Sequence, residues 1–189
     1  MHVKVLVLYC HPNHPASQIN RRLRAAAENV WGVTLHDLYH HYPDGFIDAE
    51  QEQELLHAHD VIVLQFPFYW YSTPPLLKAW QDEVLTFGFA YGQNKSLSTR
   101  QLLLAVTLGA HPNTYQRNKF AFELPELLRP LEAMSQYCGW EHRGIFSAGY
   151  EGNPGIEQLE IDAKRYQTLL EECVAGKLPP LFSTLNPSC

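Results

Sequence analysis

The sequence DVIVLQFPFYWYSTPP, from Asp60 to Pro75, places a short apolar strand directly before a loop of aromatic residues and a pair of prolines. Between Asp60 and Gln65 the residues are all apolar and mostly β-branched, as in a strand buried inside a parallel sheet. Pro74 and Pro75 suit the first turn of a helix, where a missing N–H costs little. The loop at 68–72 therefore follows the carboxyl end of a strand, where open α/β sheets bind nucleotide cofactors. Its flat side chains suit a flat ring system, although they also fit a hydrophobic loop that only caps the core.

Strands and helices alternate on both sides of this stretch. The predicted strands cover residues 3–9, 33–38, 60–65, 101–107 and 141–148, and the predicted helices cover residues 18–30, 49–58, 74–85, 124–138 and 156–174. Strands that alternate with helices through right-handed crossovers form a parallel sheet covered on both faces. We therefore expect an α/β, flavodoxin-like three-layer sandwich with a five-stranded parallel sheet in the order 2-1-3-4-5. We expect one domain over residues 1–189, with a core from about 3 to 175 and a C-terminal tail from 176 to 189.

Composition and charge argue against several classes of protein. Hydrophobic residues make up 46% of the chain and charged residues 18%, which is typical of a globular protein. The net charge of −6 argues against a nucleic-acid partner, because nucleic-acid binders normally carry a basic face. No apolar run approaches the roughly 20 residues that span a bilayer. The chain enters a predicted strand at Val3 with no charged and apolar leader before it, so we expect a cytoplasmic protein.

Neither cysteine nor histidine spacing indicates a metal site. The cysteines, which we expect to be free thiols because they form no C-x-x-C pair, are Cys10, Cys138, Cys173 and Cys189. The close histidine pairs, His40 with His41 and His57 with His59, lack the i, i+4 spacing of a metal motif and a clear third ligand. We expect these to be solvated or loop histidines.

The loop after the first predicted strand offers a site for one phosphate. Ser17 suits the N-cap of the helix that follows, and that helix directs free N–H groups and the positive end of its dipole toward the sheet edge. His11 could donate to the phosphate or pack against a cofactor. The loop lacks the glycine patterns of common ATP and NAD sites. In the alternative interpretation, His11 and Pro12 only shape a turn and Ser17 only caps the helix.

The loop after the predicted strand at 101–107 could contact the edge of a planar ligand. Gly109 and Ala110 have little or no side chain, so their backbone can approach a ligand closely and offer N–H donors. Tyr115 could then cover the site, although a tyrosine in a loop more often packs than catalyses. In the predicted topology this loop and those after Tyr9 and Gln65 lie at one crevice of the sheet.

Motifs in all three loops, and outside them, make the chain similar to a known family. The matching residues are Tyr9-Cys10-His11-Pro12, Ser17, Asn20, His36-Asp37-Leu38-Tyr39, Tyr42-Pro43-Asp44, Ile47-Asp48, Gln65-Phe66-Pro67, Trp70-Tyr71-Ser72, Pro75-Leu76-Leu77-Lys78, Phe89-Ala90-Tyr91-Gly92 and Leu128-Arg129-Pro130-Leu131. Over roughly residues 3 to 175, the chain resembles the flavodoxin-like NAD(P)H:quinone oxidoreductases of the DT-diaphorase type. Within that family it is most similar to the ancillary flavoproteins of bacterial glutathione-regulated potassium-efflux systems.

The resemblance implies a bound flavin, FMN as in the shorter bacterial members or FAD as in the longer relatives. Hydride would pass from NAD(P)H through this flavin to a quinone. By position, the resemblance assigns cofactor binding to His11, Ser17, Gln18, Ile19, Asn20, Pro67, Phe68, Tyr69, Trp70, Tyr71, Thr107, Leu108, Gly109 and Ala110. Tyr115 falls where these enzymes carry an active-site tyrosine and is the candidate catalytic residue. The histidine that follows this tyrosine in the longer enzymes has no counterpart in residues 116–121, so the resemblance supplies no second proton donor.

The resemblance also implies protein partners. Family members are typically homodimers with the flavin at the subunit interface, and the segment Phe87–Tyr91 could form part of that contact or of the site wall, with core packing equally plausible. The most similar family members dock on the cytoplasmic face of a potassium-efflux antiporter at the inner membrane. An alternative function is therefore a regulatory subunit of such an antiporter, with reductase activity secondary. Azo-dye reduction and a relative that has lost its flavin are further alternatives.

Overall fold

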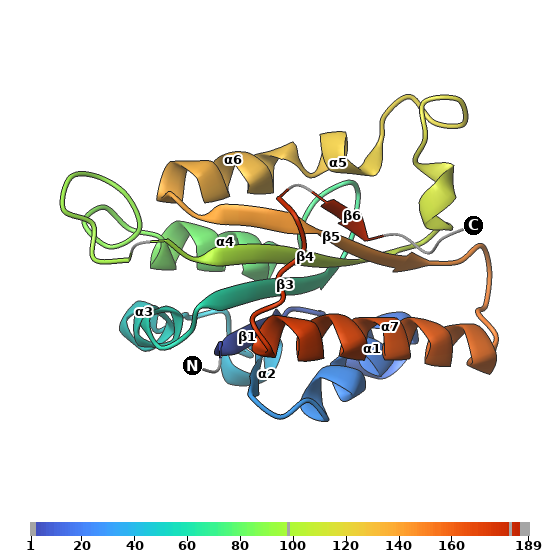
Figure 1. Ribbon diagram of the computed structural model, residues 1–189, viewed down its shortest axis with the longest axis horizontal. Coiled ribbons are helices and arrows are strands. Elements are labelled where there is room, and N and C mark those ends of the chain that lie inside the picture. Colours follow the sequence, from blue (N-terminus) through green and yellow to red (C-terminus); the bar gives the residue numbers. More distant parts are fainter. Residues whose placement is uncertain (1–2, 98, 182, 186–189) are drawn as a thin grey trace.

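The middle layer of the molecule is one parallel sheet (Figure 1). The computed structural model describes residues 3–97, 99–181 and 183–185. The strands are β1 (Val5–Tyr9), β2 (Val33–Asp37), β3 (Val61–Pro67), β4 (Gln101–Leu108), β5 (Glu141–Gly149) and β6 (Ser183–Leu185). Their order is β2-β1-β3-β4-β5-β6, so the predicted flavodoxin-like order 2-1-3-4-5 is confirmed. The short β6 extends the edge beside β5, in a segment that the sequence predicts to be a tail.

Helices cover both faces of this sheet. They are α1 (Ile19–Glu28), α2 (Leu38–His41), α3 (Ala49–His57), α4 (Pro75–Val84), α5 (Leu124–Leu127), α6 (Arg129–Cys138) and α7 (Ile156–Val174). Figure 1 shows α5 and α6 on one side of the sheet and α1 and α7 on the other. Single 3-10 turns lie at His14–Ala16 and Pro112–Thr114.

Alternate residues of the central strands enter two separate cores. Leu6 and Leu8 of β1 pack in the core beneath α3, α4, α5 and α6. Val5 and Val7 pack in the core beneath α1 and α7. Successive side chains of a strand point to opposite faces, so a strand covered on both faces must be apolar throughout. This is why the central strands are recognisable in the sequence as continuous apolar runs.

The predicted helix at 124–138 is wrong as one element, because the chain divides it at Leu128 into α5 and α6. Pro130 explains the division, since it has no N–H to donate to the preceding turn and its ring clashes there. The short α2 is also absent from the prediction. It begins where the Asp37 carboxylate accepts the backbone N–H of His40 at 3.2 Å, a local cap that a four-residue helix cannot signal by periodicity.

A buried carboxylate ties β2, α3 and α4 together. Glu52 is fully buried, and its Oε1 lies 2.6 Å from Nε2 of His36 and accepts from the Tyr42 hydroxyl at 2.7 Å. Its Oε2 accepts from the indole N–H of Trp80 at 2.8 Å. Three donors therefore surround one carboxylate in the interior, and we call these four residues the Glu52 cluster.

The histidine and cysteine predictions hold for the described residues. His40, His41 and His57 are exposed, and His59 lies in the loop between α3 and β3. His59 is nevertheless buried, and its ring contacts the carbonyl of Leu55 and the hydroxyl of Thr34 at 2.7 and 2.8 Å. The three cysteines confirmed as free are Cys10, Cys138 and Cys173, while Cys189 lies outside the described residues. Within the described part of the chain, no three His, Cys, Asp or Glu side chains gather to hold a metal ion.

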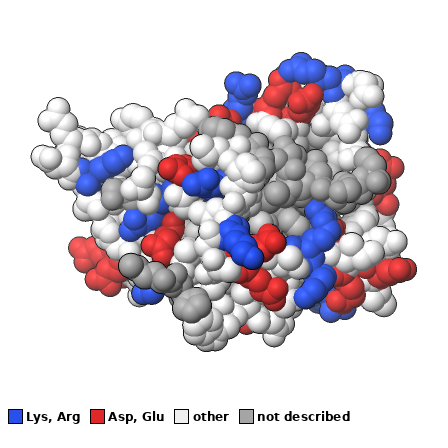
Figure 2. Space-filling model, viewed as in Figure 1, with Lys and Arg blue, Asp and Glu red and all other residues white. Residues whose placement is uncertain are grey.

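Two surface features bear on partners. Figure 2 shows Lys and Arg mixed with Asp and Glu on the face in view, with no continuous basic surface among the residues drawn in colour or white. In the segment Phe87–Tyr91, Phe89 and Ala90 are buried in the core, while Phe87 is 73% exposed. The segment therefore contributes both to core packing and to the surface.

Across the described residues, no helix combines the length and the apolar character that a membrane crossing requires.

Candidate functional site

A cavity of about 580 Å³ opens at the carboxyl ends of the parallel strands. The loops after β1, β3, β4 and β5 form its walls; in Figure 1, β5 runs toward the right-hand edge of the sheet and its loop leads from there to α7. The lining includes twelve of the predicted cofactor-binding residues, namely His11, Ser17, Gln18, Ile19, Asn20, Pro67, Phe68, Tyr69, Trp70, Thr107, Leu108 and Gly109. The three loops that the sequence indicates thus meet around one hollow.

Three predicted site residues lie outside the lining of this cavity, and four lining residues are absent from the prediction. Those outside are Tyr71, Ala110 and Tyr115. Those absent from the prediction are Tyr150, Gly152, Asn153 and Pro154, all in the loop after β5. In sequence, the Gly-Asn-Pro segment of this loop resembles an ordinary turn. The loop could be expected at the site only because all parallel strands end at the same edge of the sheet.

The amino end of α1 forms one end of the cavity. The N-cap residue is Gln18 and not Ser17 as predicted, and no side chain caps the helix. Ser17 instead ends the preceding 3-10 turn, where its N–H donates to the carbonyl of His14 at 3.1 Å. Both Ser17 and Gln18 line the cavity, and no Lys or Arg does. An anion here would depend on neutral donors and on the helix dipole.

His11 is a neutral hydrogen-bond donor beside this helix end. Burial lowers the pKa of its ring, the neighbouring His14 lowers it further, and Asp37 opposes both effects. Nδ1 of His11 accepts the backbone N–H of Asn13 at 3.1 Å, so the proton of the neutral ring is on Nε2. The ring also makes an edge contact with Tyr69, their centroids 6.0 Å apart. His11 thus presents an N–H at the rim between the first and second loops.

A buried amide network joins three walls of the cavity. Nε2 of Gln65, at the end of β3, lies 3.1 Å from both the carbonyl and the side-chain oxygen of Asn20 on α1. The Asn20 amide donates in turn to the hydroxyl oxygen of Thr107 on β4. Since the Thr107 oxygen accepts this bond, its own proton stays available to a ligand. The network also holds α1 against the sheet at the site.

The aromatic loop makes a strained turn at its tip, which keeps Trp70 and Tyr71 out of the core. Trp70 and Tyr71 have φ angles of 49° and 62°, and the N–H of Ser72 donates to the carbonyl of Tyr69 at 3.0 Å. Positive φ is unfavourable for bulky residues, and strained residues of this kind cluster at active sites and ligand-binding segments. Trp70 is 92% exposed, whereas Phe68 is buried. The interpretation that this loop only caps the core therefore fails for its tip.

Tyr115 packs beside Phe68 but is outside the lining of the cavity. Its ring makes an edge contact with Phe68 at 6.4 Å between centroids, and Phe120 contacts both Tyr115 and Tyr71. Burial raises the pKa of Tyr115, and Tyr71 raises it further, so the phenol keeps its proton at neutral pH. Ala110 continues the loop of β4 beyond the cavity wall.

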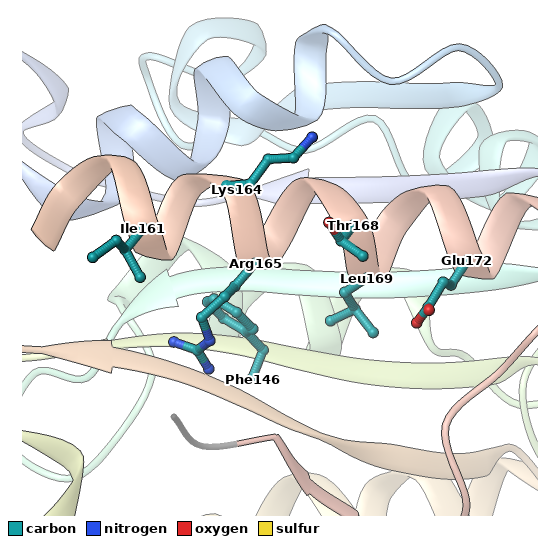
Figure 3. A pocket seen from close by; sticks show the side chains of 7 residues that line it. All are labelled: Phe146, Ile161, Lys164, Arg165, Thr168, Leu169 and Glu172. Carbon is teal, nitrogen blue, oxygen red and sulfur yellow. The ribbon is translucent and has the colours of Figure 1, made fainter. Parts of the chain in front are cut away.

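Two other hollows are less suited to a planar cofactor. A polar cavity of about 530 Å³ adjoins the first and includes His111, Asn113 and Lys119. Another of about 530 Å³ lies along α7 above Phe146 of β5, where Figure 3 shows Arg165 reaching over the Phe146 ring. Apart from Phe146, all of its lining residues come from α7, and no strand-end loop contributes. We therefore take the first cavity as the candidate site.

Comparison with known proteins supports the flavodoxin-like fold. The chain is 44% identical over 182 residues to the glutathione-regulated potassium-efflux system ancillary protein KefG of Pectobacterium carotovorum, which covers 93% of this chain and 95% of that protein. The crystal structure of general stress protein 14 of Treponema denticola in complex with FMN has a TM-score of 0.83 and 37% identity, covering 89% of this chain and 98% of that one. An NADPH-quinone reductase from P. pentosaceus has a TM-score of 0.77 and 33% identity, covering 87% and 96%. The family model described as flavodoxin-like fold matches residues 3–170, and the chain belongs to that family.

Proposed function

We propose that this chain is a flavin-dependent NAD(P)H:quinone oxidoreductase with FMN as its cofactor. The observation that carries the proposal is the cavity at the carboxyl ends of the strands, where twelve residues assigned by resemblance lie together. General stress protein 14, 37% identical to this chain, binds FMN in its crystal structure, and a second relative is an NADPH-quinone reductase. When bound, a flavin would supply hydride transfer between NAD(P)H and a quinone.

The donors around the cavity suit a flavin mononucleotide. The uncapped end of α1, the Ser17 hydroxyl and Nε2–H of His11 would hold the phosphate without any cationic side chain. Pro67, Phe68, Tyr69 and Trp70 would form an apolar wall beside the ring system. Thr107, Leu108 and Gly109 would bind its polar edge through the Thr107 hydroxyl and backbone donors.

The residues outside the cavity would support its walls. Tyr71 contacts Phe68, with ring centroids 6.1 Å apart, and would hold that side chain against the cofactor. The small side chain of Ala110 would let the backbone of the loop after β4 approach the cofactor closely. Tyr115 keeps its proton and packs beside Phe68 of the cavity wall, so it would donate a hydrogen bond to a substrate at the mouth of the cavity.

The visible spectrum of the purified protein tests this proposal. It is recorded without oxygen before and after addition of NADH or NADPH, and again after a soluble quinone. Flavin absorption that bleaches with the nucleotide and returns with the quinone supports a reductase. A protein that neither carries nor takes up flavin contradicts the assignment of the whole cavity.

The exposed rings at the mouth of the cavity favour a homodimer. Trp70 is 92% exposed and Tyr71 is 48% exposed, and large exposed aromatic side chains are typical of protein interfaces. A second copy of the chain would cover them and shield the cofactor from water. Light scattering checks this directly: wild type should have the mass of a dimer, and Trp70→Ala should shift it toward a monomer.

We propose as a second candidate that the chain is a regulatory subunit of a potassium-efflux antiporter on the cytoplasmic face of the inner membrane. The 44% identity to KefG over 93% of the chain favours this function. Potassium efflux from cells that express such an antiporter with and without this chain tests it. If efflux rises with the chain and with a variant that cannot be reduced by NAD(P)H, the regulatory role is independent of catalysis. Unchanged efflux contradicts it.

A further inference from the structure

The loop after β5 forms one wall of the cofactor cavity. Neither the family resemblance nor the comparisons with known proteins assign a function to this loop. Tyr150, Gly152, Asn153 and Pro154 all line this cavity. Tyr150, Asn153 and Pro154 also line the neighbouring polar cavity, so the loop is the partition between the two. Its position therefore decides how far the cofactor cavity extends beyond the amino end of α1.

Asn153 meets the amino end of α1 across this boundary. Nε2 of Gln18 donates to Oδ1 of Asn153 at 3.5 Å, and Gln18 is the N-cap residue of α1. Because its oxygen accepts this bond, Asn153 has its amide N–H donors left for a ligand. No Lys or Arg lines the cavity, so every neutral donor near the helix end matters for binding an anion.

A buried carboxylate anchors the first residue of the loop. The Tyr150 hydroxyl lies 2.5 Å from Oδ2 of Asp162 and 3.0 Å from the carbonyl oxygen of Gln158, both on α7. Asp162 is 5% exposed and also accepts from Arg165 at 2.5 Å. A buried charge is costly unless it is paired and hydrogen-bonded, so the buried Asp162 carboxylate requires these partners. It fastens the loop to α7 at the cavity wall.

Gly149 fixes the other side of the same loop. A Cβ atom at Gly149 would lie 2.2 Å from the carbonyl oxygen of Ala110 and 2.7 Å from Cβ of Leu108. The end of β5 therefore packs directly against the loop after β4, and nothing larger than glycine fits between them. The loop that carries Asn153 thus starts from a position that has little freedom to move.

We propose that Asn153 binds the phosphate end of the flavin cofactor and that Tyr150 and Asp162 are positioning residues that hold Asn153 in place. This inference rests on the proposed flavin function. The chemistry recognised is a phosphate monoester, which FMN carries and riboflavin lacks. Asn153 touches the cofactor, whereas Tyr150 and Asp162 act through the loop.

Titration of the flavin-free protein with FMN and with riboflavin, followed by flavin fluorescence, tests the role of Asn153. Asn153→Ala removes a neutral donor to a charged group and should weaken FMN binding about tenfold while changing riboflavin binding less than about twofold. Asn113→Ala is the matched control, because it removes the same amide from the neighbouring cavity. It should change neither affinity.

Tyr150→Phe tests the anchor, since it keeps the ring and removes only the hydroxyl. It should weaken FMN binding and spare riboflavin binding, and it should have no further effect in an Asn153→Ala background. A purely structural role would instead lower the melting temperature and weaken both ligands alike.

Two results would overturn the inference. If Asn153→Ala weakens FMN and riboflavin equally, or neither, then Asn153 does not bind the phosphate, and the flavin function stands without it. If the wild-type protein binds neither flavin, the proposed function fails and this inference fails with it. Because Asn153 is an exposed loop residue, its alanine variant should fold and give a clear result.

Discussion

The Glu52 cluster and the cofactor cavity are both polar regions of an apolar fold, and they are built in opposite ways. In the cluster, the carboxylate of Glu52 is enclosed by His36, Tyr42 and Trp80, so its oxygens are satisfied within the protein. In the cavity, the amino end of α1 has no side-chain cap, and its donors are left for a ligand. A buried polar network in which all groups are hydrogen-bonded stabilises one conformation, whereas unsatisfied donors at the edge of the sheet favour the binding of a ligand.

The Glu52 cluster and the cavity also differ in the conformation of their backbone. In the cluster, α3 begins with a regular cap, in which the Asp48 carboxylate accepts the N–H of Gln51 at 3.0 Å. At the cavity, Trp70 and Tyr71 hold positive φ angles without glycine. Strain of this kind costs stability and persists where the surrounding structure enforces it. Loss of the cluster should therefore lower stability, whereas relief of this strain should raise it.

Glu52→Ala should have the largest effect on stability. It leaves three buried donors without their acceptor, and breaking one member of such a buried group costs about 3–5 kcal/mol. Urea denaturation followed by circular dichroism measures the loss. Glu54→Ala removes an exposed carboxylate from the same helix and should change the free energy of unfolding by less than about 0.5 kcal/mol. Equal losses in the two variants would show that the cluster contributes no special stability.

Acid should weaken the wild-type protein more than a Glu52→Gln variant. Burial raises the pKa of Glu52, but the hydrogen bonds from His36, Tyr42 and Trp80 outweigh it and leave the pKa below the usual 4.5. A carboxylate with a lowered folded pKa stabilises the fold above its unfolded pKa, and this contribution is lost as the pH falls through the folded pKa. Urea midpoints of both proteins should therefore converge below about pH 4.5. Parallel curves down to about pH 3 would argue against this role of Glu52.

Trp70→Gly should make the flavin-free protein more stable than Trp70→Ala does, by about 0.5–1 kcal/mol. Glycine relieves the positive φ angle, and both variants lose the same exposed indole. Trp70→Ala keeps a Cβ atom, so it keeps the strain. Thermal unfolding of the flavin-free proteins compares the two variants. Both should bind FMN more weakly than wild type, and a glycine variant no more stable than the alanine variant would mean that the turn is not strained.

Gly109→Ala should have the smallest effect on stability and a clear effect on binding. A Cβ atom at Gly109 would meet nothing within 4 Å, so the free energy of unfolding should change by less than about 0.5 kcal/mol. The methyl group would stand where a planar ligand approaches the backbone, and FMN affinity should fall about tenfold. Fluorescence titration measures this change. Unchanged affinity would place the cofactor edge away from Gly109.

Local patterns predicted most of the secondary structure. The helix at Ile156–Val174 has the predicted limits, and the apolar runs of β1, β3 and β4 are strands. The misses follow from elements that are too short to show a period, such as α2 and β6, and from Pro130, which divides a helix whose apolar pattern continues through it. The spacing of apolar residues indicates an amphipathic helix, but it does not show that one missing N–H divides this helix.

The candidate site was predictable only where motifs mark it. Ser17 has the composition of an N-cap, yet the helix begins one residue later because Ser17 ends a 3-10 turn. The resemblance assigns Tyr115 to the site, and its ring lies beside Phe68, outside the lining of the cavity. The sequence does not mark Asn153, because its segment resembles an ordinary turn, and the proposed role of Asn153 depends on Gln18, which the fold brings beside it.

The alternation of strands and helices, the order of the sheet and the three loops at its functional edge follow from the amino-acid sequence alone. These depend on the local spacing of apolar residues and on the handedness of crossovers, which act over short stretches of chain. Which polar groups meet depends on the packing of the folded chain, as in the contacts of Gln18 with Asn153, 135 positions away, and of Glu52 with Trp80. Contacts of that kind depend on how helices pack on a twisted sheet, and no local spacing records them.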